Sequence, residues 1–399
     1  MAAFSYFRGP GPMRCSSKEL IMSLEQNVKE RYAAGAAQKE DALCCPVTYD
    51  PKYLKLIPEE ILEKDYGCGD PSQYLKEGDH VLDLGSGGGK ICYIASQVVG
   101  ASGSVIGVDF NPAMLDLALK YKESIAQDIG YSNVEFRRGR IQDLKTSLDL
   151  ANEYLIKNPI KSAEDLVEFE SKVAEWNEQK PLIPSDSIDV IVSNCVLNLV
   201  RSEDKKQLFE EMFRVVKRGG RVAISDIVSD VVVPQNLQDD DELWSGCISG
   251  AYQEKEFIKA FEDAGFYGAQ IVKRDALPWQ VVEGIEFRSI TVVAYKGKEG
   301  PCLDRNQAII YQGPWKQVWD DDGHVIKRGE RYAVCEKTFN IYTNKPYTQD
   351  IIAVPPYAEV PLNEAKDFDC KGGTERPAAI TKGKNYKITT EENANESCC

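Results

Sequence analysis

The chain has 399 residues, 43% of them hydrophobic, which is more than one hydrophobic core usually supports, so we expect two domains. Its 48 Lys and Arg residues face 63 Asp and Glu residues, giving a formal net charge of −15, and this balance without a basic stretch excludes nucleic acid as a partner. No apolar run reaches the roughly 18 residues of a membrane-spanning helix, and no secretory signal is present, so we expect no membrane partner and a cytoplasmic location.

Strands alternate with amphipathic helices through the middle of the chain, a pattern typical of a parallel sheet covered on both faces. Residues 80–84 predict the first strand, 90–99 a helix and 105–109 the second strand. Asn111 and Pro112 predict the N-cap and first turn of the next helix. Further strands are predicted at 134–138, 188–193, 221–226, 269–274 and 288–296, with a helix at 203–217.

Composition changes along the chain suggest the domain boundaries. Residues 144–183, rich in Glu, Lys and Asn, predict a helical insertion on the surface. After residue 296, short aromatic segments punctuated by Gly and Asp predict a β-rich domain. We therefore expect a cysteine-bearing segment and lid at 1–75, the main domain at 76–296, a small domain at 297–370 and a flexible tail at 371–399.

A glycine-rich segment, Asp83-Leu-Gly-Ser-Gly-Gly-Gly89, stands where the first strand must turn into a helix. Glycines let the backbone approach a ligand closely, although a tight connection or a dinucleotide site would use them too. Asp109 ends the second strand, where a carboxylate can accept hydrogen bonds from both ribose hydroxyls, cap the next helix, or do both. The glycine spacing resembles the methyltransferase form of this loop.

Twelve cysteines without an export signal are best interpreted as reduced thiols. Cys195 follows the fourth strand at the carboxyl edge of the sheet, while Cys68 and Cys247 lie in segments expected to fold over that edge. Three such thiols would form a soft site for a thiophilic centre. Zinc is the competing ligand, but the chain has no Cys-x-x-Cys pair and only two histidines.

Other cysteines carry less information. Cys92 lies on an apolar helix and is expected to be a small buried hydrophobe. Cys302, Cys335 and Cys370 receive no role from the sequence. The terminal pair Cys398 and Cys399 could trap or relay a thiophilic ligand or be incidental.

Four segments in order resemble the arsenite S-adenosylmethionine methyltransferases: Tyr66-Gly-Cys-Gly69, Asp83-Leu-Gly-Ser-Gly87, Ser193-Asn-Cys-Val-Leu-Asn-Leu199 and Cys247-Ile-Ser-Gly-Ala251. The resemblance covers residues 44–296 apart from the insertion. It implies an α/β, Rossmann-like class I methyltransferase fold, a doubly wound sheet of seven mostly parallel strands, with a smaller C-terminal β-rich domain.

The same resemblance implies roles for individual residues. Cys195 and Cys247 would bind trivalent arsenic, Cys68 would complete the metalloid site and join a thiol cycle, and Cys44 or Cys45 would support that cycle. The S-adenosylmethionine pocket would be lined by Tyr66, Asp83, Gly85, Ser86, Gly87, Asp109, Arg140, Ile141 and Asn194. Arsenic would be methylated and then returned to As(III) by a cysteine disulfide that thioredoxin or glutathione reduces, as in arsenic detoxification.

Two alternatives remain at this stage. The chain could methylate a small organic acceptor such as a quinone, sterol or thiol, with its cysteines incidental. It could instead be a non-catalytic metalloid-binding or redox-sensing protein built on the same fold.

Overall fold

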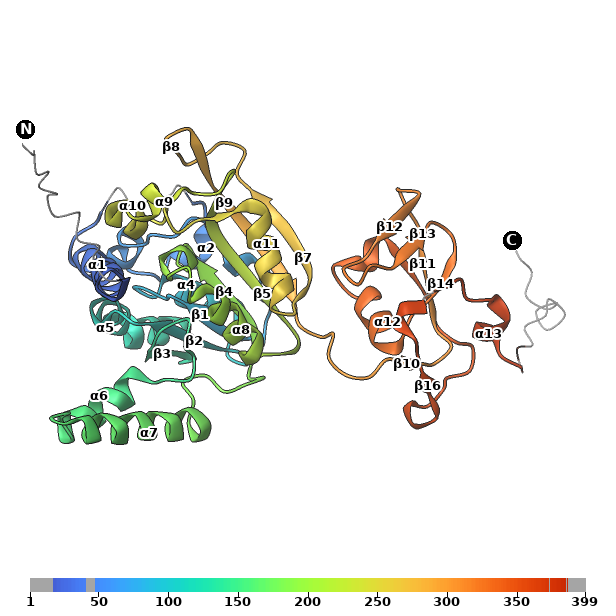
Figure 1. Cartoon of the computed structure of the whole chain (residues 1–399), viewed down its shortest axis with the longest axis horizontal. Helices are drawn as coiled ribbons and strands as arrows, with labels where there is room; N and C mark the ends of the chain where they lie inside the picture. The colour runs from blue at the N-terminus through green and yellow to red at the C-terminus, as the bar shows by residue number, and fades with distance from the viewer. Residues whose placement is uncertain (1–16, 41–46, 373, 385, 387–399) are drawn as a thin grey trace, which may run out of the picture. The chain divides into compact units, whose positions relative to one another are not determined.

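The computed structural model describes residues 17–40, 47–372, 374–384 and 386 (Figure 1). The chain divides into two compact units. The large unit comprises residues up to 264 together with 269–294, and the small unit comprises 265–268 and the residues from 295 onward. Within the described segments, no helix is long and apolar enough to cross a membrane.

The large unit is built on one sheet whose main path runs β3-β2-β1-β4-β5-β9-β7. Neighbouring pairs from β3 through β5 are parallel, and β1 lies between β2 and β4. The strands are β1 (His80–Leu84), β2 (Ser104–Asp109), β3 (Val134–Arg138), β4 (Ile188–Asn194), β5 (Val216–Ser229), β7 (Tyr267–Arg274) and β9 (Ile285–Tyr295), with short β6 (Tyr252–Gln253) and β8 (Gln280–Val282) beside β5 and β9. The predicted doubly wound, mostly parallel sheet is confirmed.

Helices between the strands bury their apolar stripes on the sheet. Asn111 accepts a hydrogen bond from the backbone N–H of Ala113, and Gly130 closes the same helix in the left-handed conformation. The helices of this unit are α1 (Ser17–Ala37), α2 (Pro51–Leu54), α3 (Glu59–Glu63), α4 (Lys90–Val99), α5 (Pro112–Ile129), α6 (Leu148–Lys157), α7 (Ala163–Gln179), α8 (Lys205–Val215), α9 (Gln235–Gln238), α10 (Asp241–Ser245) and α11 (Glu254–Asp263).

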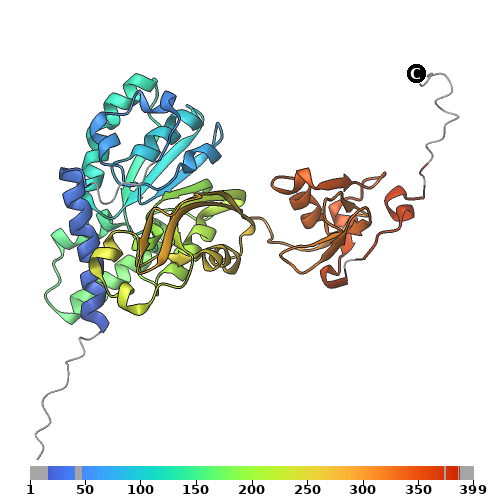
Figure 2. The ribbon, with the colours of Figure 1, turned by 90° about the horizontal axis from the view of Figure 1, so that it is seen from above.

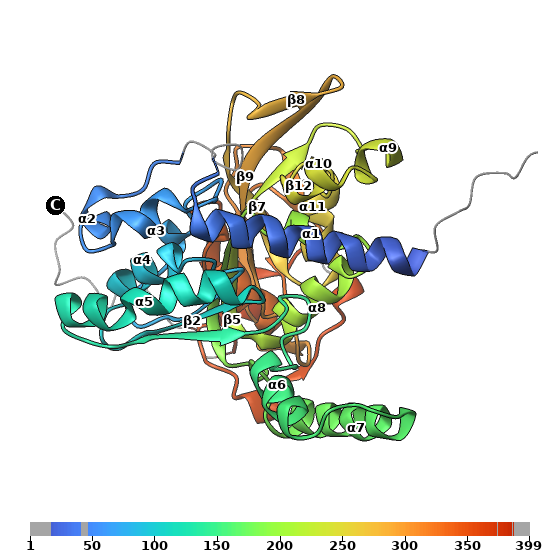
Figure 3. The ribbon, with the colours of Figure 1, turned by 90° about the vertical axis from the view of Figure 1, so that its left-hand side faces the viewer.

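Helix α1 crosses the sheet edge and contacts both α5 and α10, as Figures 2 and 3 show. Because α10 leads directly into Cys247, α1 joins two segments that are far apart in sequence. Helices α6 and α7 form the 144–183 stretch and project away from the sheet (Figure 3).

The start of β5 differs from the prediction. The strand begins at Val216, not at residue 221, and α8 ends at Val215 rather than at 217. The register with β4 passes from Ile188↔Val216 to Val190↔Arg221, so Gly219, at φ +84°, lies in an irregularity inside the strand instead of a separating turn. A glycine pair serves either conformation, which is why the sequence suggested a turn.

The small unit is rich in strands, as predicted. Its three-stranded sheet has β11 (Ala308–Tyr311) between β14 (Arg331–Ala333) and β15 (Ile351–Val354). The remaining elements are the paired strands β10 (Leu303–Asp304) and β16 (Lys366–Asp367), the pair β12 (Gln317–Trp319) and β13 (Val325–Lys327), and the helices α12 (Glu336–Tyr342) and α13 (Ala378–Lys382).

The expectation of a flexible tail from residue 371 is wrong for residues 374–384. Arg376 is only 5% exposed and forms a 2.9 Å ion pair with Asp304, and α13 follows it. This polar segment is anchored by charge and backbone hydrogen bonds, which composition does not reveal. Cys398 and Cys399 lie outside the described residues.

Candidate methyl-donor pocket and thiol site

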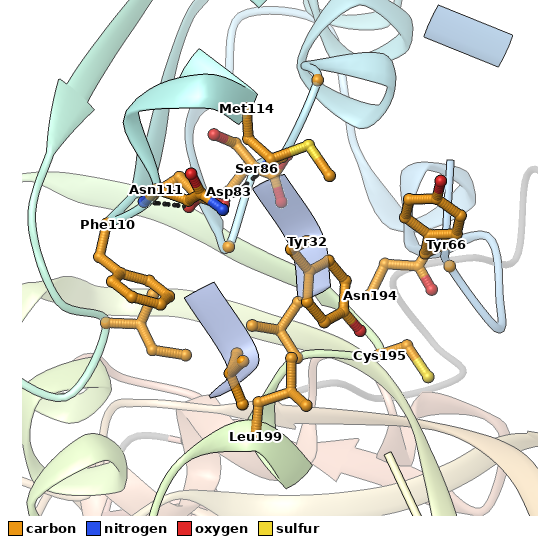
Figure 4. Close-up of a pocket in the computed structure, with 18 of the residues that line it drawn as sticks. Tyr32, Tyr66, Asp83, Ser86, Phe110, Asn111, Met114, Asn194, Cys195 and Leu199 are labelled. Carbon is orange, nitrogen blue, oxygen red and sulfur yellow. Dashed lines mark hydrogen bonds between the residues drawn. The ribbon is translucent and has the colours of Figure 1, made fainter. Parts of the chain in front are cut away.

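A pocket opens at the carboxyl ends of β1, β2 and β4, the edge where doubly wound sheets bind ligands (Figure 4). The pocket has an empty volume of about 1140 Å³, part of which is open to solvent. The structure brings all nine residues of the predicted donor pocket to its wall: Tyr66, Asp83, Gly85, Ser86, Gly87, Asp109, Arg140, Ile141 and Asn194.

The loop after β1 is shaped by its glycines. Gly85 adopts φ +71°, and a Cβ there would lie 2.4 Å from the side chain of Val196. Gly87 adopts φ +50°, and a Cβ there would meet nothing within 4 Å. The Oγ of Ser86 is buried and has no hydrogen-bond partner among the residues that the structure describes. The loop thus presents an open cradle and an unsatisfied hydroxyl to the pocket.

Two buried carboxylates flank this loop. One oxygen of Asp109 accepts the N–H of Gly87 at 2.9 Å and the other accepts the N–H of Asn111 at 2.8 Å, so this side chain ties the loop to the start of α5. Burial raises the pKa of Asp109, and these N–H donors oppose that shift. Burial raises the pKa of Asp83 to about 7, although the thiol of Cys92 donates to it at 3.2 Å. Cys92 is buried as predicted, but it also has a polar partner.

Asn194, at the end of β4, holds the turn that carries Cys68. Its Oδ1 accepts the N–H groups of Cys68 and Gly69, both at 2.9 Å, and its Nδ2 donates to the carbonyl of Gly69 at 2.8 Å. A Cβ on Gly67 would lie 2.1 Å from that amide, so only glycine permits the close approach. The Tyr66-Gly-Cys-Gly69 turn is therefore fixed over the sheet edge.

Three cysteines from separate segments share one buried cluster: Cys68, Cys195 and Cys247 are 2%, 4% and 4% exposed. The sulfur atoms of Cys68 and Cys195 and a carboxylate oxygen of Asp226 all lie within 4.8 Å of one another. The thiol of Cys247 donates to the carbonyl of Cys195 at 3.3 Å. Only Cys195 of the three also lines the pocket, so it connects the thiols to the donor side (Figure 4).

Cys195 and Cys247 have φ values of +64° and +63°, which non-glycine residues rarely adopt. Such conformations persist where the surrounding structure enforces them, and they gather at functional sites. Two of the three clustered thiols have such conformations. This indicates that the placement of the sulfur atoms, and not the preferred backbone conformation of cysteine, determines the structure at these positions.

Sequence reasoning missed Asp226 and Tyr32. Asp226 is fully buried in β5 and accepts the N–H of Leu197 at 2.8 Å, and burial raises its pKa to about 6. An acid inside the mainly apolar 222–228 run was the available signal. Tyr32 of α1 lines the pocket, with its hydroxyl 3.6 Å from the sulfur of Cys247. The four-residue spacing of Val28, Tyr32 and Ala36 marked the inner face of this helix.

Cys44 and Cys45 lie outside the described residues. Arg140, at the pocket wall, pairs with Glu25 of α1 at 3.3 Å. The N-terminal helix therefore contributes to the pocket on the donor side as well as on the thiol side.

Comparison with known proteins extends these observations. Residues 75–161 and 157–265 match the family model of a methyltransferase domain, and residues 298–386 match a domain of unknown function, DUF8838. The arsenite methyltransferase of Aquipseudomonas alcaligenes is 31% identical over 332 residues, covering 79% of this chain and 86% of that protein. The arsenite methyltransferase of Homo sapiens is 30% identical over 323 residues, covering 78% and 76%.

Among solved structures, an arsenic(III) S-adenosylmethionine methyltransferase from Chlamydomonas reinhardtii superposes with a TM-score of 0.53 at 27% identity. The match covers 82% of this chain and 100% of that chain.

Proposed function

Because the chain belongs to the arsenite methyltransferase family and is an S-adenosylmethionine-dependent methyltransferase, we propose that it methylates trivalent arsenic bound by Cys68, Cys195 and Cys247. The observation that carries this proposal is the geometry of one buried cluster: the sulfur atoms of Cys68 and Cys195 lie within 4.8 Å of each other, the thiol of Cys247 donates to the Cys195 carbonyl at 3.3 Å, and Cys195 lies on the wall of the donor pocket.

The polar groups and the open space of the pocket suit S-adenosylmethionine as the methyl donor. The free hydroxyl of Ser86 and the open space at Gly87 suit a ligand that lies against the glycine loop. Each oxygen of Asp109 already accepts one backbone N–H and has a lone pair left for a ribose hydroxyl. When bound, S-adenosylmethionine supplies an electrophilic methyl group on a positively charged sulfur. The remaining predicted residues would hold it in place: Tyr66, Asp83, Gly85, Arg140, Ile141 and Asn194.

Arsenous acid would enter as the substrate. Condensation with three thiols breaks three As–O and three S–H bonds, forms three As–S bonds and releases three water molecules, so no net charge is buried. The apolar neighbours Ile227 and Phe287, both 0% exposed, keep water away from the product. The arsenic retains a lone pair, which is the nucleophile for the methyl group, and alignment of the two reactants contributes several kcal/mol, at best about 7 to 11.

A thiol cycle would complete the turnover. Methyl transfer releases S-adenosylhomocysteine and leaves a cationic, formally pentavalent arsenic. Two of its As–S bonds then break as one S–S bond forms, so those two sulfurs give up two electrons and arsenic returns to As(III), and a water molecule adds to the arsenic with release of a proton. The proximity of Cys68 to Cys195 supports this pair as the donor, with Cys44 or Cys45 relaying the disulfide outward. Thioredoxin or glutathione then reduces it.

The test is to incubate the purified chain with S-adenosylmethionine, arsenite and a dithiol, and to identify arsenic products by mass spectrometry. We expect methylated arsenic from the unmodified chain and none from Cys195→Ser or Cys247→Ser. Cys302→Ser, which changes a cysteine of the small unit, should retain activity. Each variant should still bind S-adenosylhomocysteine by calorimetry, which separates loss of the metalloid site from loss of the fold.

The same variants distinguish an organic acceptor from arsenite. If the chain methylated a quinone or a thiol and the serine variants retained that activity without any arsenic product from the unmodified chain, the arsenic proposal would be wrong.

A further inference from the structure

The small unit contains a second group of three thiols. The sulfur atoms of Cys302, Cys335 and Cys370 all lie within 4.8 Å of one another. Cys335 is 1% exposed, whereas Cys302 and Cys370 are partly exposed. None of the three belongs to the methylation site, which lies entirely in the large unit.

The backbone holds these cysteines from three separate segments. Cys302 immediately precedes β10, and its carbonyl accepts the N–H of Phe368, just after β16, at 2.9 Å. Cys370 follows that strand, and its carbonyl contacts Nε2 of His324. Cys335 caps α12, where its sulfur accepts the N–H of Thr338 at 3.4 Å. The thiols are therefore brought together by the fold and not by sequence neighbours.

The spacing suits a single bound atom. Three bonds of about 2.3 Å at nearly right angles hold sulfur atoms about 3.3 Å apart, so thiols already within 4.8 Å of one another need only small side-chain shifts to bind one atom.

The donor set favours a three-coordinate metalloid over zinc. Structural zinc requires four ligands, and among the described residues no fourth Cys, His, Asp or Glu joins this group. The nearby His324 is not available, because its Nδ1 contacts Asp320 at 2.7 Å and its Nε2 contacts the carbonyl of Cys370.

We propose that Cys302, Cys335 and Cys370 form a second binding site for trivalent arsenic, separate from the methylation site. Arsenous acid condenses with the three neutral thiols, three water molecules leave, and neither arsenic nor sulfur changes oxidation state. The bound atom links the start of β10, the start of α12 and the segment after β16. Arsenic would thereby stabilise the small unit without being methylated there.

The test measures the alkylation rates of individual cysteines by peptide mass spectrometry in the reduced full-length chain, with arsenite alone as the probe. At an arsenite concentration ten times the dissociation constant, alkylation of Cys302 and Cys370 should slow by about tenfold. Cys335 is already buried and serves as a ligand rather than a reporter.

Two variants make the test specific. Cys335→Ser keeps a preferred N-cap residue for α12 but removes one soft ligand, so protection of Cys302 and Cys370 should be lost. Thr338→Val removes the hydroxyl that lies 3.1 Å from the Cys335 sulfur and keeps all three thiols, so protection should remain.

Unchanged alkylation of Cys302 and Cys370 in the presence of arsenite would overturn the proposal, as would protection that persists in Cys335→Ser or protection by zinc but not by arsenite. Failure here is distinguishable from failure of the proposed function, because the methylation site is reported separately by Cys68, Cys195, Cys247 and the arsenic products.

Discussion

Asn194 shows how one amide can position a reactive thiol. It lines the donor pocket. Its side chain also accepts the N–H groups of Cys68 and Gly69 and donates to the carbonyl of Gly69. The resemblance to the arsenite methyltransferases implied that Asn194 lines the pocket. Its second role, holding the Tyr66–Gly69 turn, depends on a contact across more than one hundred residues and could not be predicted from spacing.

Replacing Asn194 should therefore affect both stability and chemistry. Asn194→Ala leaves buried backbone groups unpaired, which should lower the free energy of unfolding by about 3 kcal/mol. Displacement of Cys68 should reduce arsenic methylation by about 100-fold. The matched control is Ser193→Ala, which loses one buried hydrogen bond to the Leu84 carbonyl and should cost about 1 kcal/mol while retaining activity. Denaturant titration and initial rates measure the two effects, and equal activity in both variants would contradict the assigned role.

A second prediction for single residues compares Gly87, in the pocket, with Gly130, at the end of α5. Gly87→Ala places a methyl group in open pocket space at φ +50°, so it should cost about 1 to 2 kcal/mol of stability and also weaken S-adenosylhomocysteine binding. Gly130→Ala, at φ +85° and equally open, should cost a similar amount but leave binding unchanged, because it lies at the end of α5 away from the pocket. If calorimetry found the same ligand affinity in both variants, the proposed contact of the ligand with the loop at Gly87 would be wrong.

At the scale of elements, α1 links the donor pocket to the Cys247 segment. Arg31 donates to the carbonyl of Glu242 and to the hydroxyl of Ser245, both at 2.9 Å, and so attaches α1 to α10. Burial, followed by the nearby Cys247, raises the pKa of Tyr32 on the same helix, so its hydroxyl stays neutral beside the sulfur.

Arg31→Ala should release this attachment. We expect hydrogen exchange to quicken by roughly tenfold, equivalent to about 1.4 kcal/mol, in residues 24–37 and 241–248, with little change in the central strands. The KM for arsenite should rise as the Cys247 segment becomes less fixed. Lys172→Ala, which removes an exposed ion pair with Glu175 on α7, is the control and should change neither quantity. If exchange became faster by a similar factor throughout the large unit, the variant would be generally destabilised instead.

Sequence patterns predicted elements better than they predicted contacts between elements. Apolar runs such as His80–Leu84 and the cap at Asn111 are local signals, and the structure reproduces both. The rule that parallel strands present ligands at their carboxyl edge predicted the place of Cys195, whereas Cys68 and Cys247 join its buried cluster through segments that fold over that edge. The spacing on α1 marked its inner face but not the elements it packs against, and the meeting of Cys302, Cys335 and Cys370 depends on long-range packing that local sequence patterns do not reveal.

At the scale of the whole molecule, the two units should respond differently to pH. In the small unit, hydrogen bonds from Tyr342 and His324 outweigh burial and lower the pKa of Asp320 below 3.8. Burial opposes the protonation of His324, but the bond to Asp320 prevails and raises the pKa of that imidazole above 6.5. The contribution of Asp320 is lost as pH falls through its lowered pKa, and that of His324 is lost as pH rises through its raised pKa. This pair should therefore stabilise the small unit most between about pH 4 and 6.5.

His324→Gln tests this pH dependence. Hydrogen exchange in residues 308–311 and 331–333 should be faster in the variant than in the unmodified chain at pH 5.5, and the difference should shrink as pH rises above 6.5. Central strands of the large unit serve as the internal reference and should show no such difference. If the difference in exchange rate between the variant and the unmodified chain grew with rising pH, the assigned pKa shifts would be wrong.

The most direct measurement of the central claim is the coordination of arsenic in the large unit. We would record the arsenic X-ray absorption of the full-length chain carrying Cys335→Ser, Cys398→Ser and Cys399→Ser, loaded with one equivalent of arsenite. The account predicts three sulfur neighbours and no oxygen, and loss of that signature when Cys195→Ser is added. Arsenic that keeps its oxygen neighbours, or a three-sulfur signature that survives Cys195→Ser, would contradict the account.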